Sequence, residues 1–150
     1  MNSITSNAAL EITNLLYRYC ELMDGGRLED VAALFRHARV KVLGSEALAG
    51  EAEMLALWRR HVIIYPDGTP RTKHLVSNPI VAIDEAANRA TVRSYYSVYQ
   101  ATDGFPLQLI GAGRYHDEFG RHEGCWRFTF RDYTLFDLRG DLSRHLKAVE

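Results

Sequence analysis

The sequence predicts an α+β domain in which three helices cover one face of a curved antiparallel sheet. The first observation is a change of hydrophobic period: apolar residues recur every three or four positions before Pro70 and every second position after it. The second is the shortness of the links between the later apolar segments, which favours an antiparallel meander. The third is size, since 150 residues and 17.1 kDa suit one domain with its own core. We therefore expect residues 1–150 to form a single domain.

Three segments near the start have the period of amphipathic helices. Residues 8–23 place apolar side chains on one face and end at Gly25-Gly26, a pair that terminates helices. A short helix is predicted over 28–35, where acidic residues at its start suit the helix dipole. A third is predicted over 51–64, because a strong turn signal follows it. Their apolar faces comprise Ile12, Leu15, Leu16, Tyr19, Leu22 and Met23, then Val31, Leu34 and Phe35, then Met54, Leu57, Trp58 and His61.

The second half of the chain has the composition of strands. Four long segments are rich in β-branched and aromatic residues: 73–84, 89–102, 107–119 and 125–138. A shorter strand is expected over 39–44, between the second and third helices. Gly111 and Gly113 alternate inside a long strand and predict a bulge or a close backbone approach. Because long strands twist and helices cover one face, we expect the arrangement to enclose a pocket.

Composition narrows the class of protein. Lys and Arg total 18 and Asp and Glu 19, with no basic stripe, so we expect no nucleic-acid partner and no anionic membrane partner. No apolar stretch approaches the roughly 18 residues that span a bilayer, and the start of the chain lacks the pattern of a signal peptide. Cys20 and Cys125 are isolated thiols, which fits a reduced compartment. We expect a soluble, cytoplasmic protein.

Two residues are candidates for chemistry, each with a structural alternative. Asp24 precedes a glycine and suits a turn, yet a carboxylate at a helix C-terminus opposes the dipole by about 0.3–1 kcal/mol. His74 begins a predicted apolar strand, where a lone histidine is either a hydrogen-bonded structural residue or a base. On the residues alone, both alternatives stay open. The other histidines show no metal-ligand spacing, so we expect no metal and no cofactor: His37, His61, His116, His122 and His145.

Several segments, taken in order, carry a family resemblance. They are 23–35, Thr72–Asn78, Gly113–Phe119, Gly124–Phe128 and Gly140–Ser143. Their order and spacing resemble the SnoaL-like proteins of the NTF2-like superfamily, over nearly the whole chain. The resemblance implies a cone-shaped α+β barrel around an apolar pocket, usually in a homo-oligomer. Members include scytalone dehydratase, a hexachlorocyclohexane dehydrochlorinase, polyketide cyclases and the small subunits of ring-hydroxylating dioxygenases.

The resemblance also implies roles for individual residues. Asp24 stands where scytalone dehydratase-like members hold the carboxylate of an Asp-His dyad, and His74 stands where they hold the general base. Such a carboxylate fixes the tautomer of the imidazole and raises its basicity. Scytalone dehydratase has two tyrosines that act on the substrate carbonyl, and this chain has Met23 and Leu43 there. The dehydrochlorinase has a lysine where this chain has Tyr19. Polarising a carbonyl would therefore need another donor.

The expected substrate-binding residues are Tyr19, Met23, Trp58, Tyr96, Tyr115 and Arg114. Tyr96 and Tyr115 stand, by resemblance, at a pocket histidine and a pocket asparagine of scytalone dehydratase. A tyrosine hydroxyl in an apolar pocket can donate to an oxyanion, and ordinary packing on the sheet is the alternative. Arg114 and Arg131 either bind an acidic group of the substrate or form a structural ion pair or oligomer contact.

We expect a lyase or isomerase that resembles scytalone dehydratase and uses no metal. The Asp-His dyad would remove a proton from a small, apolar cyclic ketone or polyketide-like substrate, and dehydration, isomerisation or cyclisation would follow. The alternative is a non-catalytic ligand-binding or structural subunit that resembles the small subunit of a ring-hydroxylating dioxygenase. In that case Asp24 and His74 are structural. Because both faces of the strand 89–102 carry apolar or aromatic residues, we also expect a homo-oligomer that uses the outer face of the sheet.

Overall fold

The computed structural model describes residues 7–43 and 48–147. Within these ranges the chain forms three helices and seven strands. In chain order they are α1 (Ala8–Asp24), α2 (Leu28–Leu34), β1 (Arg39–Lys41), β2 (Leu48–Ala49), α3 (Gly50–His61), β3 (Thr72–Asp84), β4 (Arg89–Thr102), β5 (Phe105–His122), β6 (Cys125–Asp132) and β7 (Leu138–Arg139).

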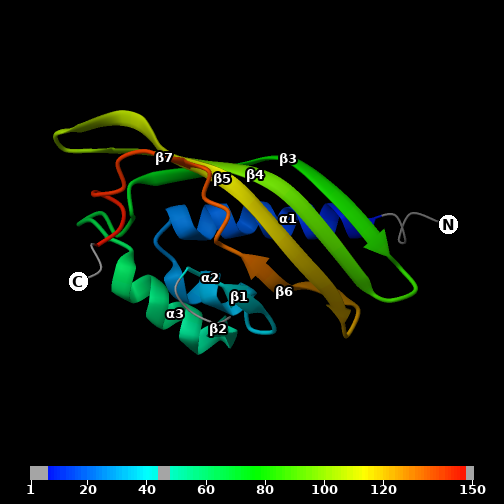
Figure 1. Cartoon of the computed structure of the whole chain (residues 1–150). Coiled ribbons are helices and arrows are strands. Elements are labelled where there is room, and N and C mark those ends of the chain that lie inside the picture. The colour runs from blue at the N-terminus through cyan, green and yellow to red at the C-terminus, as the bar shows by residue number, and fades with distance from the viewer. Residues whose placement is uncertain (1–6, 44–47, 148–150) are drawn as a thin grey trace.

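The strands form one mixed, curved sheet. Its order is β2-β1-β6-β5-β4-β3, and β7 pairs with β5. The four long strands form the predicted antiparallel meander, whereas β1 runs parallel to β6. The predicted curved sheet with helices on one face is confirmed (Figure 1). It does not close into a barrel, because β3 and β2 are the two ends of the strand order and do not pair with each other. The fold is an open α+β sheet rather than a barrel.

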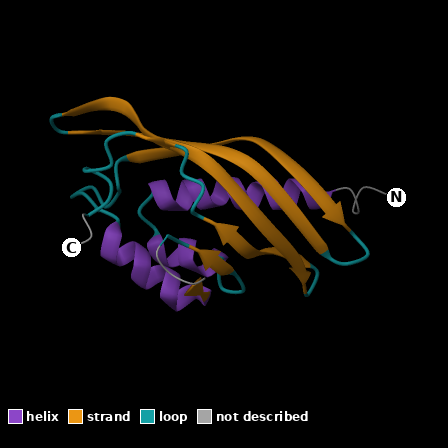
Figure 2. Cartoon of the chain, viewed as in Figure 1, coloured by secondary structure: helices purple, strands orange, loops and turns teal. Residues whose placement is uncertain are grey.

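All three helices lie on one face of the sheet, as Figures 1 and 2 show. The apolar side of α1 packs toward the long strands and contributes the fully buried Ile12 and Leu16. Phe35, just after α2, stacks on Phe128 of β6 with ring centroids 4.8 Å apart. Helix α3 buries Met54 and Trp58. The predicted helical faces therefore contribute to the core, and the curved sheet covers them.

Three predicted elements end earlier than expected. The third helix stops at His61, because the β-branched run 62–64 favours extended backbone and Ile63 N–H donates to the His145 carbonyl at 2.9 Å. The last long strand stops at Asp132, whose carboxylate accepts bonds from the backbone N–H and the hydroxyl of Thr134. This turn stabilised by an Asp side chain ends the strand. The short strand predicted over 39–44 ends at Lys41, and Gly44 lies outside the described residues.

The segment that follows β6 turns back along β5. Arg114 N–H donates to the Leu135 carbonyl at 2.9 Å. A Cβ atom on Gly113 would overlap that carbonyl, so the predicted close approach at this glycine is confirmed. The predicted bulge lies beside Gly111, where the register between β4 and β5 shifts. This path brings Tyr133 and Phe136 to the concave side of the sheet.

Candidate active site

Asp24 and His74 come into direct contact although 50 positions separate them. Asp24 is the last residue of α1, and His74 is the third residue of β3. The imidazole Nδ1 lies 2.6 Å from Asp24 Oδ1. Their side chains are only 8% and 6% exposed, respectively. The expected carboxylate–imidazole hydrogen bond is therefore present and shielded from water.

The start of β3 holds the Asp24 carboxylate in place. Oδ1 also accepts the Thr72 hydroxyl at 2.8 Å, and Oδ2 accepts the backbone N–H of His74 at 2.8 Å. Three hydrogen bonds therefore hold this one carboxyl group. An ionised carboxylate can only accept, so Nδ1 of His74 carries the proton and Nε2 carries the lone pair. These bonds also offset the unfavourable position at the helix C-terminus.

A glycine after α1 makes this meeting possible. Gly26 has φ of 72°, and a Cβ atom there would overlap the carbonyl oxygen of Gly68. The end of α1 therefore packs closely against the predicted turn, in which Gly68 N–H donates to the Tyr65 carbonyl. That turn leads directly into β3. The backbone conformation at Gly26 thus places Asp24 next to the strand that carries His74.

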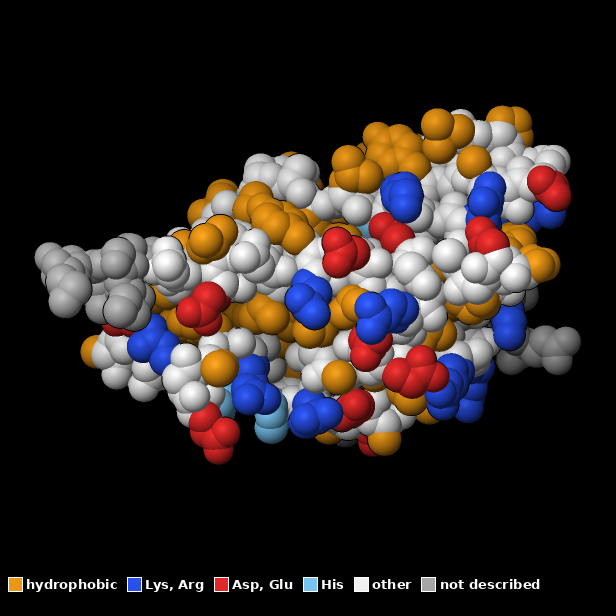
Figure 3. Space-filling view, turned by 180° about the vertical axis from the view of Figure 1, so that it is seen from behind, with side chains coloured by type: hydrophobic (Ala, Val, Ile, Leu, Met, Phe, Trp, Pro, Cys, Tyr) orange, Lys and Arg blue, Asp and Glu red, His pale blue; other side chains and the backbone are white. Residues whose placement is uncertain are grey.

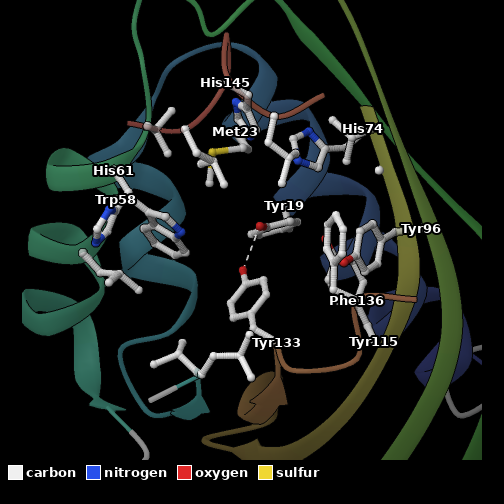
Figure 4. A pocket seen from close by; sticks show the side chains of 18 of the residues that line it. Tyr19, Met23, Trp58, His61, His74, Tyr96, Tyr115, Tyr133, Phe136 and His145 are labelled. Carbon is white, nitrogen blue, oxygen red and sulfur yellow. Dashed lines mark hydrogen bonds between the residues drawn. The ribbon is translucent and has the colours of Figure 1, made fainter. Parts of the chain in front are cut away.

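A cavity of about 390 Å³ lies on the concave side of the sheet. Its size and its mainly apolar wall are typical of small-molecule sites. His74 faces into it, as Figure 4 shows, whereas Asp24 binds His74 and does not itself line the cavity. Five of the six expected substrate-binding residues line this cavity: Tyr19, Met23, Trp58, Tyr96 and Tyr115.

The tyrosines of the cavity form an ordered aromatic wall. Tyr96 and Tyr115 stack with ring centroids 4.3 Å apart, and Tyr19 meets Tyr115 edge-on at 6.0 Å. The Tyr19 ring also lies edge-on to His74 at 6.3 Å. Burial raises the pKa of Tyr96 to about 12 and raises the pKa of Tyr19 well above its ordinary value. These hydroxyls are neutral hydrogen-bond donors near pH 7.

Arg114, the sixth expected substrate-binding residue, does not line the cavity. Along β5 it alternates with Gly113 and Tyr115, so it points to the other face of the sheet. It forms an exposed two-bond pair with Asp137 at 2.8 and 3.0 Å. Arg131 forms the structural ion pair that the sequence left open, with the fully buried Asp117 at 2.7 Å.

Tyr133 and Phe136 line the cavity and were not predicted from sequence. Tyr133 reaches the cavity because the strand ends at Asp132, and its hydroxyl donates to the Tyr19 hydroxyl at 2.7 Å. The spacing Asp132-x-Thr134 was a usable signal, since Asp and Thr so placed form this kind of turn. Phe136 lines the cavity for the same reason.

His145 also lines the cavity, and it belongs to a C-terminal segment that closes one side of the cavity. Its ring lies 5.9 Å from that of His74, and its buried Nδ1 has no partner among the described residues. Burial, and next the neighbouring His74, lower the pKa of His145 to about 4. The segment is held by Gln100, whose amide donates to the Arg144 carbonyl at 3.0 Å. The stretch 141–145 therefore caps the cavity rather than forming a solvated tail.

The described part of the chain offers neither a metal-binding cluster nor a membrane-spanning helix. In residues 7–43 and 48–147, no cluster of three His, Cys, Asp or Glu side chains is arranged to hold a metal ion. Over the same ranges, no helix combines the length and apolarity needed to cross a bilayer.

Known structures share this fold. An NTF2-like protein with a cystatin-like fold from Novosphingobium aromaticivorans is 23% identical, with a TM-score of 0.69, over 91% of this chain and 92% of that one. A protein provisionally named scytalone dehydratase from the same organism is 21% identical, with a TM-score of 0.65, over 88% and 86%. The beta subunit of a provisionally named aromatic-ring-hydroxylating dioxygenase, also from this organism, is 18% identical, with a TM-score of 0.71, over 97% and 99%. None of the curated proteins matches this sequence.

The fold and the cavity define the class: an α+β domain whose helices and curved sheet enclose a small apolar site. The family follows from the sequence, because the model of the SnoaL-like domain matches residues 5–132. The chain belongs to the SnoaL-like family, so the resemblance of its sequence to SnoaL-like proteins is confirmed. Its fold is similar to that of an NTF2-like protein of known structure.

Proposed function

We propose that this protein is an enzyme that removes a carbon-bound proton from a small, largely apolar cyclic ketone or polyketide-like substrate. The observation that carries the proposal is the Asp24–His74 contact of 2.6 Å on the wall of an apolar cavity. A base on this wall can take a proton only from a ligand that enters the cavity. The likeness to a protein provisionally named scytalone dehydratase supports the same class of reaction.

His74 is the proposed general base, and Asp24 is its positioning residue. Asp24 accepts the Nδ1 proton and so directs the Nε2 lone pair toward the cavity. Nε2 takes the proton from a carbon next to the substrate carbonyl, and the electron pair of that C–H bond forms an enolate. As the imidazolium forms, the buried carboxylate stabilises its charge.

The fate of the enolate sets the product. With a hydroxyl on the β-carbon, the electron pair expels it, and the imidazolium proton converts it to water, so a β-hydroxy ketone gives an enone and water. Return of the proton to another carbon gives an isomer instead. Attack of the carbanion on a second carbonyl gives a ring. All three outcomes begin with the same proton transfer.

The test therefore measures the proton transfer that all three outcomes share. Cyclic ketones and β-hydroxy ketones are incubated with the protein in D2O, and exchange of the proton next to the carbonyl is followed by NMR. Wild type should accelerate exchange or turnover, and His74→Gln should abolish the acceleration. His122→Gln, a substitution of an exposed histidine on β5, is the matched control and should behave as wild type. Equal rates for wild type and His74→Gln would refute the proposal.

The second candidate is a non-catalytic subunit, and its support is the likeness to a dioxygenase beta subunit over 97% of this chain. In that case the Asp24–His74 contact only stabilises the junction of α1 and β3. The two candidates differ in a simple observation. Copurification with a larger iron-sulfur protein, together with no exchange on any ketone, would favour the subunit.

A further inference from the structure

The hydroxyl groups of Tyr19 and Tyr133 meet inside the cavity. Tyr19 comes from α1 and Tyr133 from the segment after β6, and the Tyr133 hydroxyl donates to the Tyr19 oxygen at 2.7 Å. Figure 4 shows the two hydroxyls pointing toward each other from different elements, with open space beside them. Only one of the two hydroxyls can donate within the pair, so the other hydroxyl has a proton that needs another acceptor. The hydrogen bonds of the described residues supply none.

A buried positive charge lies against the rings of this pair. The Arg131 guanidinium carbon is 4.5 Å from the centre of the Tyr19 ring and 5.4 Å from that of Tyr133. Asp117 binds two of the guanidinium nitrogens, and Nη1 has no partner among the described residues. Burial raises the pKa values of both tyrosines, and the Arg131 charge opposes that rise. The hydroxyls therefore stay protonated near pH 7, beside a charge that favours a neighbouring anion.

The pair lies within reach of a ligand that touches His74. The Tyr19 ring is perpendicular to the His74 ring, with centroids 6.3 Å apart, and both line the same cavity. A planar cyclic ketone in this space can place the carbon next to its carbonyl against His74. Met23 and Leu43, which also line the cavity, offer no donor for the oxygen.

We propose that the Tyr19 and Tyr133 hydroxyls, with Arg131 behind them, form the site that receives the carbonyl oxygen of the substrate and stabilises its enolate. The inference rests on the proposed function for its substrate class. When Nε2 of His74 takes the carbon-bound proton, the C–H electron pair forms a C=C bond, and the C=O π electrons move onto oxygen. The Tyr19 proton, aligned by the Tyr133 hydroxyl, donates to that oxygen. Such preorganised donors stabilise charge without reorganisation during the reaction.

The first measurement uses a probe that does not react. 2-Naphthol carries a negative oxygen on a planar ring system when it ionises, and its fluorescence distinguishes the neutral and anionic forms. Its binding is titrated over the pH range in which the free probe ionises. Wild type should bind the anion, and Tyr133→Phe and Tyr19→Phe should each weaken that binding by about ten- to a hundredfold, as expected for one hydrogen bond to a charged group. Tyr95→Phe, on the exposed face of β4, is the matched control and should bind as wild type.

The second measurement separates this inference from the proposed function. Asp24→Asn removes the orientation of the base but leaves both hydroxyls, so it should bind the 2-naphthol anion as wild type does. On a substrate that turns over, Tyr19→Phe should lower kcat by about 10²–10³-fold, as removal of one oxyanion donor does. If His74→Gln keeps full activity while the tyrosine variants lose the anion, the proposed function fails and the anion site stands. If wild type does not bind the anion, or both tyrosine variants bind it equally well, the anion site is refuted.

Discussion

Two Arg–Asp pairs on opposite faces of β5 have nearly the same geometry and opposite surroundings. Arg131 and Asp117 share bonds of 2.7 and 3.0 Å, and both side chains are 0% exposed. Arg114 and Asp137 share bonds of 2.8 and 3.0 Å at the surface. The inner pair lies in a region of low dielectric, where the charge of Arg131 acts on nearby tyrosines. Water screens the charges of the outer pair. Environment rather than geometry therefore decides what such a pair does.

The same contrast holds for the two faces of the sheet. The inner face carries His74, Tyr96 and Tyr115 around the cavity. The outer face exposes apolar side chains on neighbouring strands, and Figure 3 shows hydrophobic groups along the top of the molecule, where the sheet and the β4–β5 hairpin lie. These exposed side chains include Leu75, Ile80, Tyr95, Tyr99 and Leu109. The inner face surrounds a small cavity, and the outer face exposes apolar side chains to solvent.

The largest expected effect is on the inner face, at Asp24. Asp24→Asn should lower kcat by about 10³–10⁴-fold, because an amide no longer holds the imidazole in the tautomer that a base requires. The folded structure should persist, since only one atom of the side chain changes. Rates on an active ketone and thermal unfolding are measured together. Asp103→Asn, at an exposed turn, is the matched control. Full activity of Asp24→Asn would contradict the assigned role.

The next largest effect is expected at the buried ion pair, and the exposed pair supplies the comparison. Asp117→Asn leaves the Arg131 charge buried without a counter-charge and should lower the free energy of unfolding by about 3–5 kcal/mol. Asp137→Asn removes the partner of Arg114, which is 41% exposed, and should change stability little. Urea unfolding of both variants supplies the comparison. Equal losses in the two variants would show that burial does not distinguish the pairs.

A smaller effect is expected from pH at His145. Its pKa in the folded protein is about 4, below the ordinary value of 6.5, because burial disfavours its charged form. Between these values the unfolded chain binds a proton that the folded chain does not, so this residue makes stability fall as pH drops from about 6.5 to about 4. The full contribution is roughly 3 kcal/mol.

His145→Gln should remove this part of the pH dependence. The free energy of unfolding is measured in urea at several pH values across that window. Asp24 and His74, which face His145, are the same in both proteins, so the difference between variant and wild type isolates His145. His122→Gln serves as the control. An unchanged slope in His145→Gln would contradict the assignment.

The smallest effect on the free energy of folding is expected on the outer face. We expect a homo-oligomer that uses this face, so Leu75→Lys should shift the protein toward the monomer while leaving the cavity intact. Leu10→Lys changes an equally exposed leucine on α1 and should leave the assembly unaltered. Sedimentation at micromolar concentration measures both. A wild-type protein that sediments only as a 17.1 kDa species would contradict the expectation.

The sequence alone determined the elements and their faces. Hydrophobic period marked α1, α2 and the long strands, because burying an apolar stripe requires the period of the element that carries it. Gly25-Gly26 placed the end of α1, and Gly111 and Gly113 marked the bulge and the close approach. Asp24 and His74 were also found from sequence, through a dipole argument and a family resemblance. These features are local, so a short stretch of residues contains them.

Only the tertiary structure decided which distant side chains share the cavity. Tyr133 joins Tyr19 across 114 positions, and His145 reaches His74 through a C-terminal segment that no periodic pattern marks. It also decided that Arg114 lies outside and Arg131 inside, and that the sheet stays open. Such outcomes depend on which surfaces pack together after the elements have formed. Packing is a property of the whole chain, and it cannot be found in the neighbours of one residue.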